Sequence, residues 1–261
     1  MNVRFVPIML VMALAGMTTP SMAQEERGQL WDVQTITVRP DHMDEFMETV
    51  GMVKAAAAAA NLPAEYGWHI WVQDFDVAIA SMAPDMAAFD DPEAWMRAFQ
   101  GTPGEAMMTE AMGKFMNEIS SQSGLREVYE QVEAWSYVPA NPTFEDAAHA
   151  ERFDFWVKPG MQEQLEKVIT DIMAFQAKLE SPYPINGYRM HFGDTGRVTF
   201  LVMNDGWADY YGKNDMEAKM EATGTSAEWE AIMTEMRDCL SAFESSRMDY
   251  VADLSYTGPG M

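Results

Sequence analysis

The chain has 261 residues and a formal net charge of −24 at pH 7, because 41 Asp and Glu outnumber 17 Lys and Arg. Such a negative field repels nucleic acid and anionic membrane surfaces, so we exclude both as partners. The single cysteine, Cys239, cannot form an internal disulfide. The fold must therefore depend on its hydrophobic core, with Cys239 as a buried structural thiol.

Residues 1–23 have the features of an export signal. Arg4 supplies a positive start, an apolar run follows over 6–16, and Ser21-Met22-Ala23 places small residues before a cleavage point after Ala23. The apolar run is short for a membrane span, and an uncleaved anchor is the alternative. We therefore predict an exported protein, periplasmic or secreted, with no membrane association once the signal peptide is removed.

The first half of the mature chain, residues 24–139, alternates strand and helix signals. Asp41, directly after Pro40, predicts the start of a long helix. Short runs rich in β-branched and aromatic residues predict strands. The expected strands are 31–38, 66–72, 77–82 and 126–138, and the expected helices are 41–60 and 104–121, with broken helix over 86–99.

A linker over residues 140–149 contains Pro142, and a second half follows over 150–257, with a tail over 258–261. Residues 193–196 have the composition of a hairpin turn. The expected strands are 152–157, 185–192, 197–203 and 248–255, and the expected helices are 161–179 and 226–243, with irregular helix over 207–220.

Both halves carry the same landmarks in the same order, which indicates a tandem duplication. The matching pairs are Val38-Arg39-Pro40 with Val157-Lys158-Pro159, the aromatic strands 66–71 with 186–191, Met108-Thr109-Glu110 with Met233-Thr234-Glu235, Ser120-Ser121 with Ser245-Ser246, and Trp135-Ser136-Tyr137 with Leu254-Ser255-Tyr256.

Each half has the order strand, helix, strand, strand, helix, strand, which is the βαββαβ pattern of ferredoxin-like folds. The segments from Val38 to Phe46 and from Val157 to Leu165, each a strand, a turn and an amphipathic helix, resemble the dimeric α+β barrel families. These include antibiotic-biosynthesis-type monooxygenases, NIPSNAP-type proteins and stress-responsive barrel proteins. The resemblance implies an α+β fold in which two tandem ferredoxin-like halves form one barrel within the chain.

Strand alternation separates side chains beneath the helices from side chains between the two sheets. Trp68, Ile70 and Val72, matched with Tyr188, Met190 and Phe192, form an apolar set suited to the helices. The same parity places Arg152 on the opposite face. The candidate ligand-binding residues of the barrel interior are His69, Trp71, Asp154, Trp156, Arg189 and His191. The alternative is a structural network, such as Arg189 paired with Asp154, since buried polar groups need partners.

No catalytic residue is identifiable, because the chain lacks a Gly-Xaa-Ser-Xaa-Gly elbow, a His-Glu-Xaa-Xaa-His helix and a phosphate-binding glycine loop. We predict no cofactor and no metal site. His69 and His191 lack local metal-ligand spacing, and methionines at helical spacing, such as Met108 and Met112, favour core packing over copper(I) binding.

Three functions remain open from the sequence. The first is an exported barrel that binds a small apolar or aromatic ligand between its sheets. The second, implied by the resemblance, is a cofactor-independent monooxygenase-like enzyme in which a histidine or arginine stabilises a substrate oxyanion. The third is a non-catalytic structural or interaction module. The sequence does not decide between these functions, and it does not determine the oligomeric state.

Overall fold

The computed structural model describes residues 28–91, 93–118, 125–140, 147–213 and 216–259. The expected signal peptide, the Ser120-Ser121 pair and most of the expected linker lie outside these ranges. Of the helices in the described part of the chain, none combines the length and apolar character needed to cross a bilayer.

The strands are β1 (Leu30–Thr37), β2 (His69–Gln73), β3 (Asp76–Ala83), β4 (Leu125–Gln131), β5 (His149–Val157), β6 (Ile185–Phe192), β7 (Arg197–Asn204) and β8 (Leu240–Tyr250). The α-helices are α1 (Met43–Ala60), α2 (Ala94–Arg97), α3 (Glu105–Glu118), α4 (Gln162–Lys178), α5 (Trp207–Lys213), α6 (Met216–Thr223) and α7 (Ser226–Cys239). Short 3-10 helices include η3 (Met86–Asp90), η4 (Glu133–Trp135) and η5 (Ala252–Leu254).

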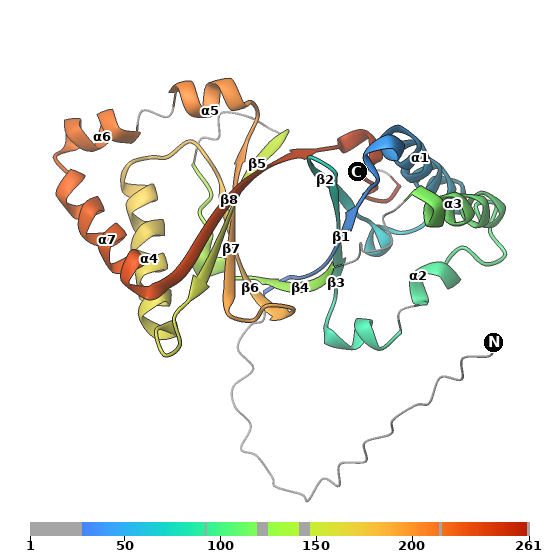
Figure 1. Cartoon of the computed structure of the whole chain (residues 1–261), viewed down its shortest axis with the longest axis horizontal. Helices are drawn as coiled ribbons and strands as arrows, with labels where there is room; N and C mark the ends of the chain where they lie inside the picture. Colours follow the sequence, from blue (N-terminus) through green and yellow to red (C-terminus); the bar gives the residue numbers. More distant parts are fainter. Residues whose placement is uncertain (1–27, 92, 119–124, 141–146, 214–215, 260–261) are drawn as a thin grey trace, which may run out of the picture.

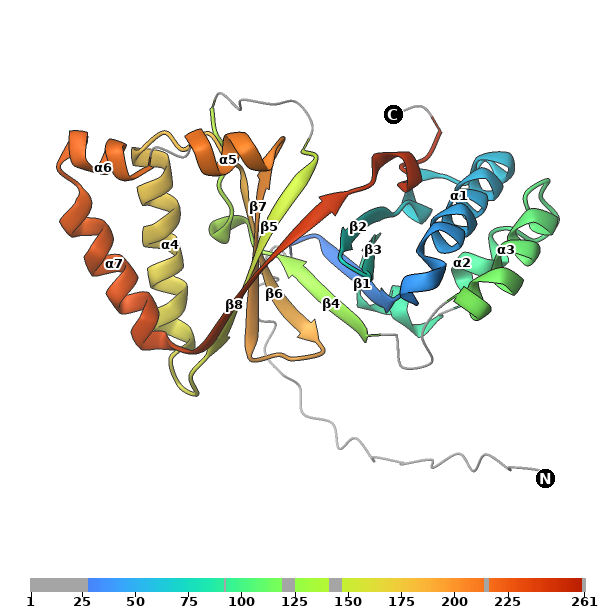
Figure 2. The same cartoon turned by 45° about the horizontal axis from the view of Figure 1, so that its top comes forward.

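The eight strands close into an antiparallel barrel in the order β1-β3-β2-β8-β5-β7-β6-β4. Closure leaves no exposed sheet edge. The fold is thus of the mixed α+β class. Within the barrel, β4-β1-β3-β2 and β8-β5-β7-β6 follow the same relative order. Helices α1 and α3 cover the outer face of the first set of strands, and α4 and α7 cover the second set on the opposite side of the barrel (Figures 1 and 2).

Amphipathic sequence explains how the helices attach to the barrel. Phe46 and Val50 of α1 are buried against Ile70 in the core of the first half. Leu165 and Ile169 of α4 occupy corresponding places in the second. Each pair is spaced four residues apart, so both side chains lie on one helix face.

The boundary between α7 and β8 differs from the prediction. The helix was expected to continue to Phe243, but it ends at Cys239, and Leu240 adopts an extended conformation. Phe243 instead pairs across the sheet with Phe155, and their rings stack 5.1 Å apart. Cross-strand aromatic pairing therefore overrides the local helical pattern.

After β4, the chain crosses onto the outer face of the second half. Tyr137 forms paired backbone hydrogen bonds with Ile185. The Ser136 hydroxyl accepts the Gly187 N–H at 3.2 Å, and the Tyr137 hydroxyl donates to the Ser181 carbonyl at 2.9 Å.

After β8, the chain makes the same set of contacts with the first half. Tyr256 pairs with Trp68 through backbone hydrogen bonds. The Ser255 hydroxyl accepts the Ile70 N–H at 2.9 Å, and the Tyr256 hydroxyl donates to the Leu62 carbonyl at 2.6 Å. Each half thus completes the helix-covered core of the other.

Candidate functional site

The β2–β3 and β6–β7 hairpins decide which side chains face the barrel interior. In the first hairpin, Val77 pairs with Val72, and in the second, Val198 pairs with Arg189. Val77 and Val198 occupy equivalent positions, because each also pairs with the first strand of its own half. Val72 packs on the core beneath α1. Arg189 holds the corresponding hairpin position and faces the helices as well, where its guanidinium lies 3.2 Å from the Glu166 carboxylate of α4.

The expectation that Arg189 points into the barrel is therefore corrected. Similar residues around Gly67 and Gly187 suggested that these two glycines match. The strand pairing instead matches Gly187 with Ile70, three residues further along the first half. An odd offset exchanges the two faces of a strand, so the predicted faces of β6 were reversed.

His191 does not reach the barrel interior either. It lies at an irregularity in the β4–β6 pairing, between Met190, which pairs with Tyr129, and Phe192, which pairs with Val128. Its imidazole is exposed, and Nε2 lies 2.6 Å from the Glu130 carboxylate. The histidine pair proposed for the interior is thus separated.

His69 and Trp71 of β2 lie on the inner face, opposite to Trp68. His69 Nδ1 is 3.0 Å from the Tyr250 hydroxyl, and its ring centroid is 5.8 Å from that of Trp31. The Trp71 and Tyr250 rings are 4.9 Å apart. Burial lowers the pKa of His69, so its imidazole is neutral at pH 7.

Asp154 is a buried carboxylate on the inner face of β5. It accepts a hydrogen bond from Thr199 at 2.6 Å and forms an ion pair with Arg152 at 2.9 Å. Trp156 follows on the same face at the end of the strand. Its indole donates to Asp194 of the β6–β7 turn at 2.5 Å.

A second buried pair adjoins Asp154. Arg197 contacts Glu127 at 2.7 Å, and the Tyr129 hydroxyl donates to the same carboxylate at 2.6 Å while accepting from Arg197. Arg197 also lies 3.5 Å from Asp154. The positive charges of Arg152 and Arg197 therefore balance the negative charges of Asp154 and Glu127 inside the barrel. The sequence prediction missed Glu127 and Tyr129, although alternation along 126–138 could have indicated them.

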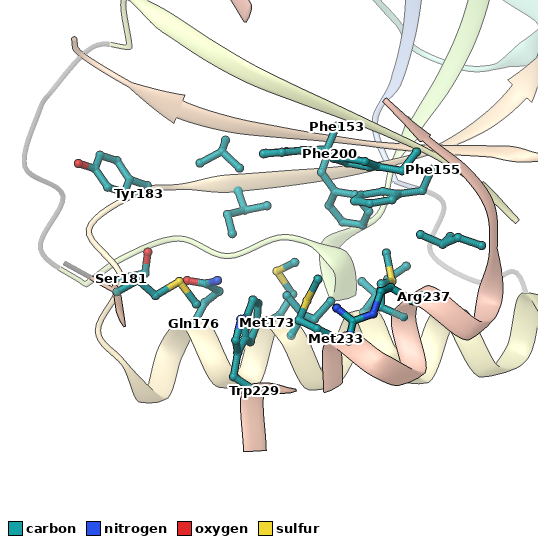
Figure 3. A pocket seen from close by; sticks show the side chains of 18 of the residues that line it. Phe153, Phe155, Met173, Gln176, Ser181, Tyr183, Phe200, Trp229, Met233 and Arg237 are labelled. Carbon is teal, nitrogen blue, oxygen red and sulfur yellow. The ribbon is translucent and has the colours of Figure 1, made fainter. Parts of the chain in front are cut away.

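A cavity of about 430 Å³ lies on the outer face of the second half, between the sheet and helices α4 and α7 (Figure 3). We call it the α4–α7 pocket. Its wall is mainly aromatic and aliphatic. The aromatic lining residues are Phe153, Phe155, Tyr183, Phe200, Tyr210, Trp229 and Phe243.

Few polar groups reach the α4–α7 pocket. Gln176 and Ser181 lie toward the end that carries Tyr183, and Arg237 lies toward the other end (Figure 3). Burial, followed by the effect of nearby Glu151, raises the pKa of the lining Tyr210, so this phenol stays neutral. The pocket is therefore apolar with hydrogen-bonding groups at its two ends.

Different residue sizes at the helix interfaces explain the cavity. In the first half, a Cβ atom at Gly104 would lie 2.1 Å from the Ala56 carbonyl oxygen, so α3 begins in close contact with α1. In the second half, Phe175 of α4 and Trp229 of α7 stack with their centroids 5.0 Å apart. Two large rings hold α7 away from α4, and space remains above the sheet. The sequence prediction missed this pocket because it depends on helix separation.

In the described ranges, no three His, Cys, Asp or Glu side chains are placed to hold a metal ion together. Cys239, the last residue of α7, is buried, and burial raises the pKa of its thiol, which keeps it protonated at neutral pH.

No protein-family model matches the sequence, and no curated protein matches it significantly. Solved structures do resemble the fold. A proposed monooxygenase from Fusobacterium nucleatum subsp. nucleatum is 8% identical, covers 90% of this chain and 97% of its own, and has a TM-score of 0.57. An anthrone oxidase-like protein is 12% identical, covers 90% and 95%, and has a TM-score of 0.52.

A variant of the chlorite dismutase from Candidatus Nitrospira defluvii is also similar. It is 11% identical, covers 88% of this chain and 93% of its own, and has a TM-score of 0.51. At these identities the likeness concerns the fold alone. The predicted α+β class and the barrel are confirmed, since the closed eight-stranded antiparallel barrel matches the architecture of the dimeric α+β barrel proteins.

Proposed function

We propose that the protein is an exported α+β barrel that binds a small apolar or aromatic ligand in the α4–α7 pocket. The observation that carries this proposal is the aromatic cavity of about 430 Å³, a size within the range of small-molecule sites. Phe153, Phe155 and Phe243 offer ring faces that lie nearly parallel to one another. Planar rings pack well against such a wall.

The space between the sheets is a second location for the ligand. His69, Trp71, Asp154 and Trp156 lie on that face, but the charges there already pair with each other. A ligand in the interior would have to fit around this network. The α4–α7 pocket requires no such disruption and is the better supported site.

A neutral fluorescent probe, N-phenyl-1-naphthylamine, tests the location. We expect fluorescence enhancement with the mature protein and little with Met173→Trp, which fills the α4–α7 pocket. His69→Ala alters the interior and serves as the control, with binding unchanged. Binding lost in His69→Ala but retained in Met173→Trp would place the ligand between the sheets instead. Melting curves of both variants establish that they are folded.

We also propose that the halves are two ferredoxin-like units from a tandem duplication. The equal strand orders and the matching hydrogen bonds of Ser136 with Gly187 and Ser255 with Ile70 support this origin. The segment after each half's last strand thus packs on the other half. This reciprocal arrangement is expected when two chains of a symmetric barrel are joined into one.

Export to the periplasm or medium is likewise a proposal, based on the signal in residues 1–23. N-terminal sequencing of the protein recovered outside the cytoplasm should give a chain that begins at Gln24. Recovery of that protein with Met1 retained would contradict cleavage.

A cofactor-independent monooxygenase-like activity is the second candidate function, favoured by the descriptions of two similar structures. In the α4–α7 pocket, Arg237 is the lining residue with a positive charge, and we assign it the stabilisation of a substrate oxyanion. Oxygen uptake with a phenolic substrate, lowered in Arg237→Met at unchanged ligand affinity, would support it. Ligand binding without oxygen uptake supports the first candidate, and absence of binding supports a structural or interaction module.

A further inference from the structure

Gln176 is an unusual residue for the wall of an apolar cavity. It is 9% exposed, and its side chain lies at the pocket (Figure 3). No hydrogen-bond partner for its amide exists among the described residues. Its side-chain oxygen and nitrogen are not fully enclosed by protein atoms, so the amide borders open space. A buried amide carries a cost unless something pairs with it.

The first half shows what this position looks like without a pocket. The Ser181 N–H donates to the Gln176 carbonyl at the end of α4, and the Leu62 N–H donates to the Ala57 carbonyl at the end of α1. Ala57 therefore holds the position that corresponds to Gln176, and it is fully buried. The fold itself does not require a polar side chain here.

The charge of the pocket argues for an uncharged ligand. Of the described residues that line it, Arg237 is the one with a formal charge. Its guanidinium already contacts Glu230 at 3.4 Å and the Thr234 hydroxyl at 3.0 Å, and its side chain is 60% exposed. This guanidinium already has a carboxylate beside it and is mostly exposed to solvent, so an ionised ligand would gain little from it in exchange for leaving water.

We propose, on the basis of the binding function above, that the ligand class is a neutral aromatic molecule with one hydroxyl or carbonyl group, and that Gln176 recognises this group. The amide can donate to either group and can also accept from a hydroxyl. The stacked phenylalanines contact the ring system, and Gln176 fixes its orientation. Hydrocarbons of the same shape fill the pocket but leave the amide unpaired.

Calorimetric titration with 2-naphthol, naphthalene and ionised 2-naphthoate tests the inference. The mature protein should bind 2-naphthol about threefold to tenfold more tightly than naphthalene, as expected for one hydrogen bond. It should bind 2-naphthoate more weakly than 2-naphthol. Gln176→Leu should abolish the preference for 2-naphthol, and Gln176→Met provides a second apolar variant if the first is unstable. Gln164→Leu, an exposed position on the same helix, is the matched control and should behave as wild type.

Each failure points to a different error. Equal affinity for 2-naphthol and naphthalene, unchanged in Gln176→Leu, would overturn the inference and leave the proposed function intact. Tightest binding of 2-naphthoate, lost in Arg237→Gln, would overturn it in favour of an anionic ligand. Absence of binding by any of the three compounds to the wild-type protein would contradict the proposed function itself.

Discussion

The charged side chains of Arg152, Asp154, Glu127 and Arg197 are stable inside the barrel because each has an opposite charge within contact distance. Arg197 is 9% exposed and lies against Glu127, with Tyr129 completing the cluster. Such buried ion pairs stabilise the fold little more than apolar residues in both positions would. The loss of one member, however, leaves a buried charge without a partner and is strongly destabilising. The network therefore constrains which residues the interior tolerates.

Replacement of Arg197 by methionine should destabilise the fold by about 3–5 kcal/mol, because Glu127 loses its partner. The double variant Arg197→Met with Glu127→Leu should be less destabilised than the sum of the two single variants. Urea unfolding of the four proteins in this cycle measures the coupling. Additive effects would show that the two side chains do not stabilise each other.

His69 should make stability depend on pH in a defined direction. Burial lowers its pKa, so the unfolded chain takes up a proton near pH 6.5 while the folded protein does not. The stability linked to neutral His69 is present above that pH and is lost as the pH falls. His69→Gln should therefore lose less stability than wild type between pH 7 and pH 5, measured by thermal unfolding. Parallel curves for the two proteins would contradict this assignment.

The type and order of the elements were largely predictable from sequence, whereas the boundary between α7 and β8 and the register of β6 were not. Pro40 with Asp41 and the apolar spacing of α1 and α4 are local signals. The register depends on hydrogen bonds with segments far along the chain, such as the one that the Gly187 N–H donates to the Ser136 hydroxyl. Matching by residue identity therefore assigned the correct strand and the wrong face.

The segments that cross between halves should contribute to stability through their tyrosines. Tyr256→Phe removes the hydroxyl that donates to the Leu62 carbonyl at 2.6 Å, and should cost about 1–2 kcal/mol. Tyr137→Phe removes the matching bond to the Ser181 carbonyl, which is less buried, and should cost less. Chemical unfolding compares the pair. Equal stability of Tyr256→Phe and wild type would show that this contact is not needed.

Helix spacing creates a further difference between the halves. Gly104→Ala should be strongly destabilising, since its Cβ would overlap the Ala56 carbonyl. Gly113→Ala, within α3, is the control and should be neutral or slightly stabilising, because an added Cβ would have no atom within 4 Å among the described residues. Thermal unfolding of both variants checks the prediction. Tolerance of Gly104→Ala would mean that α1 and α3 are not in close contact.

For the molecule as a whole, composition and repeated landmarks predicted an α+β barrel, but the candidate site lies on a different side of the sheet from the one expected. The residues of the barrel interior were predictable from the alternation of side chains along the strands, as Asp154 shows. The α4–α7 pocket was not, because it results from the stacking of Phe175 on Trp229, two residues far apart in the sequence. Large apolar residues on two helices normally predict a filled core.

Mass spectrometry of small molecules released from the purified mature protein tests the central claim most directly. The wild-type protein should release an aromatic or apolar compound, and Met173→Trp, with its pocket filled, should release none while melting as a folded protein. His69→Ala should still release the compound. Retention of the same compound by Met173→Trp, or its loss from His69→Ala alone, would contradict the assignment of ligand binding to the α4–α7 pocket.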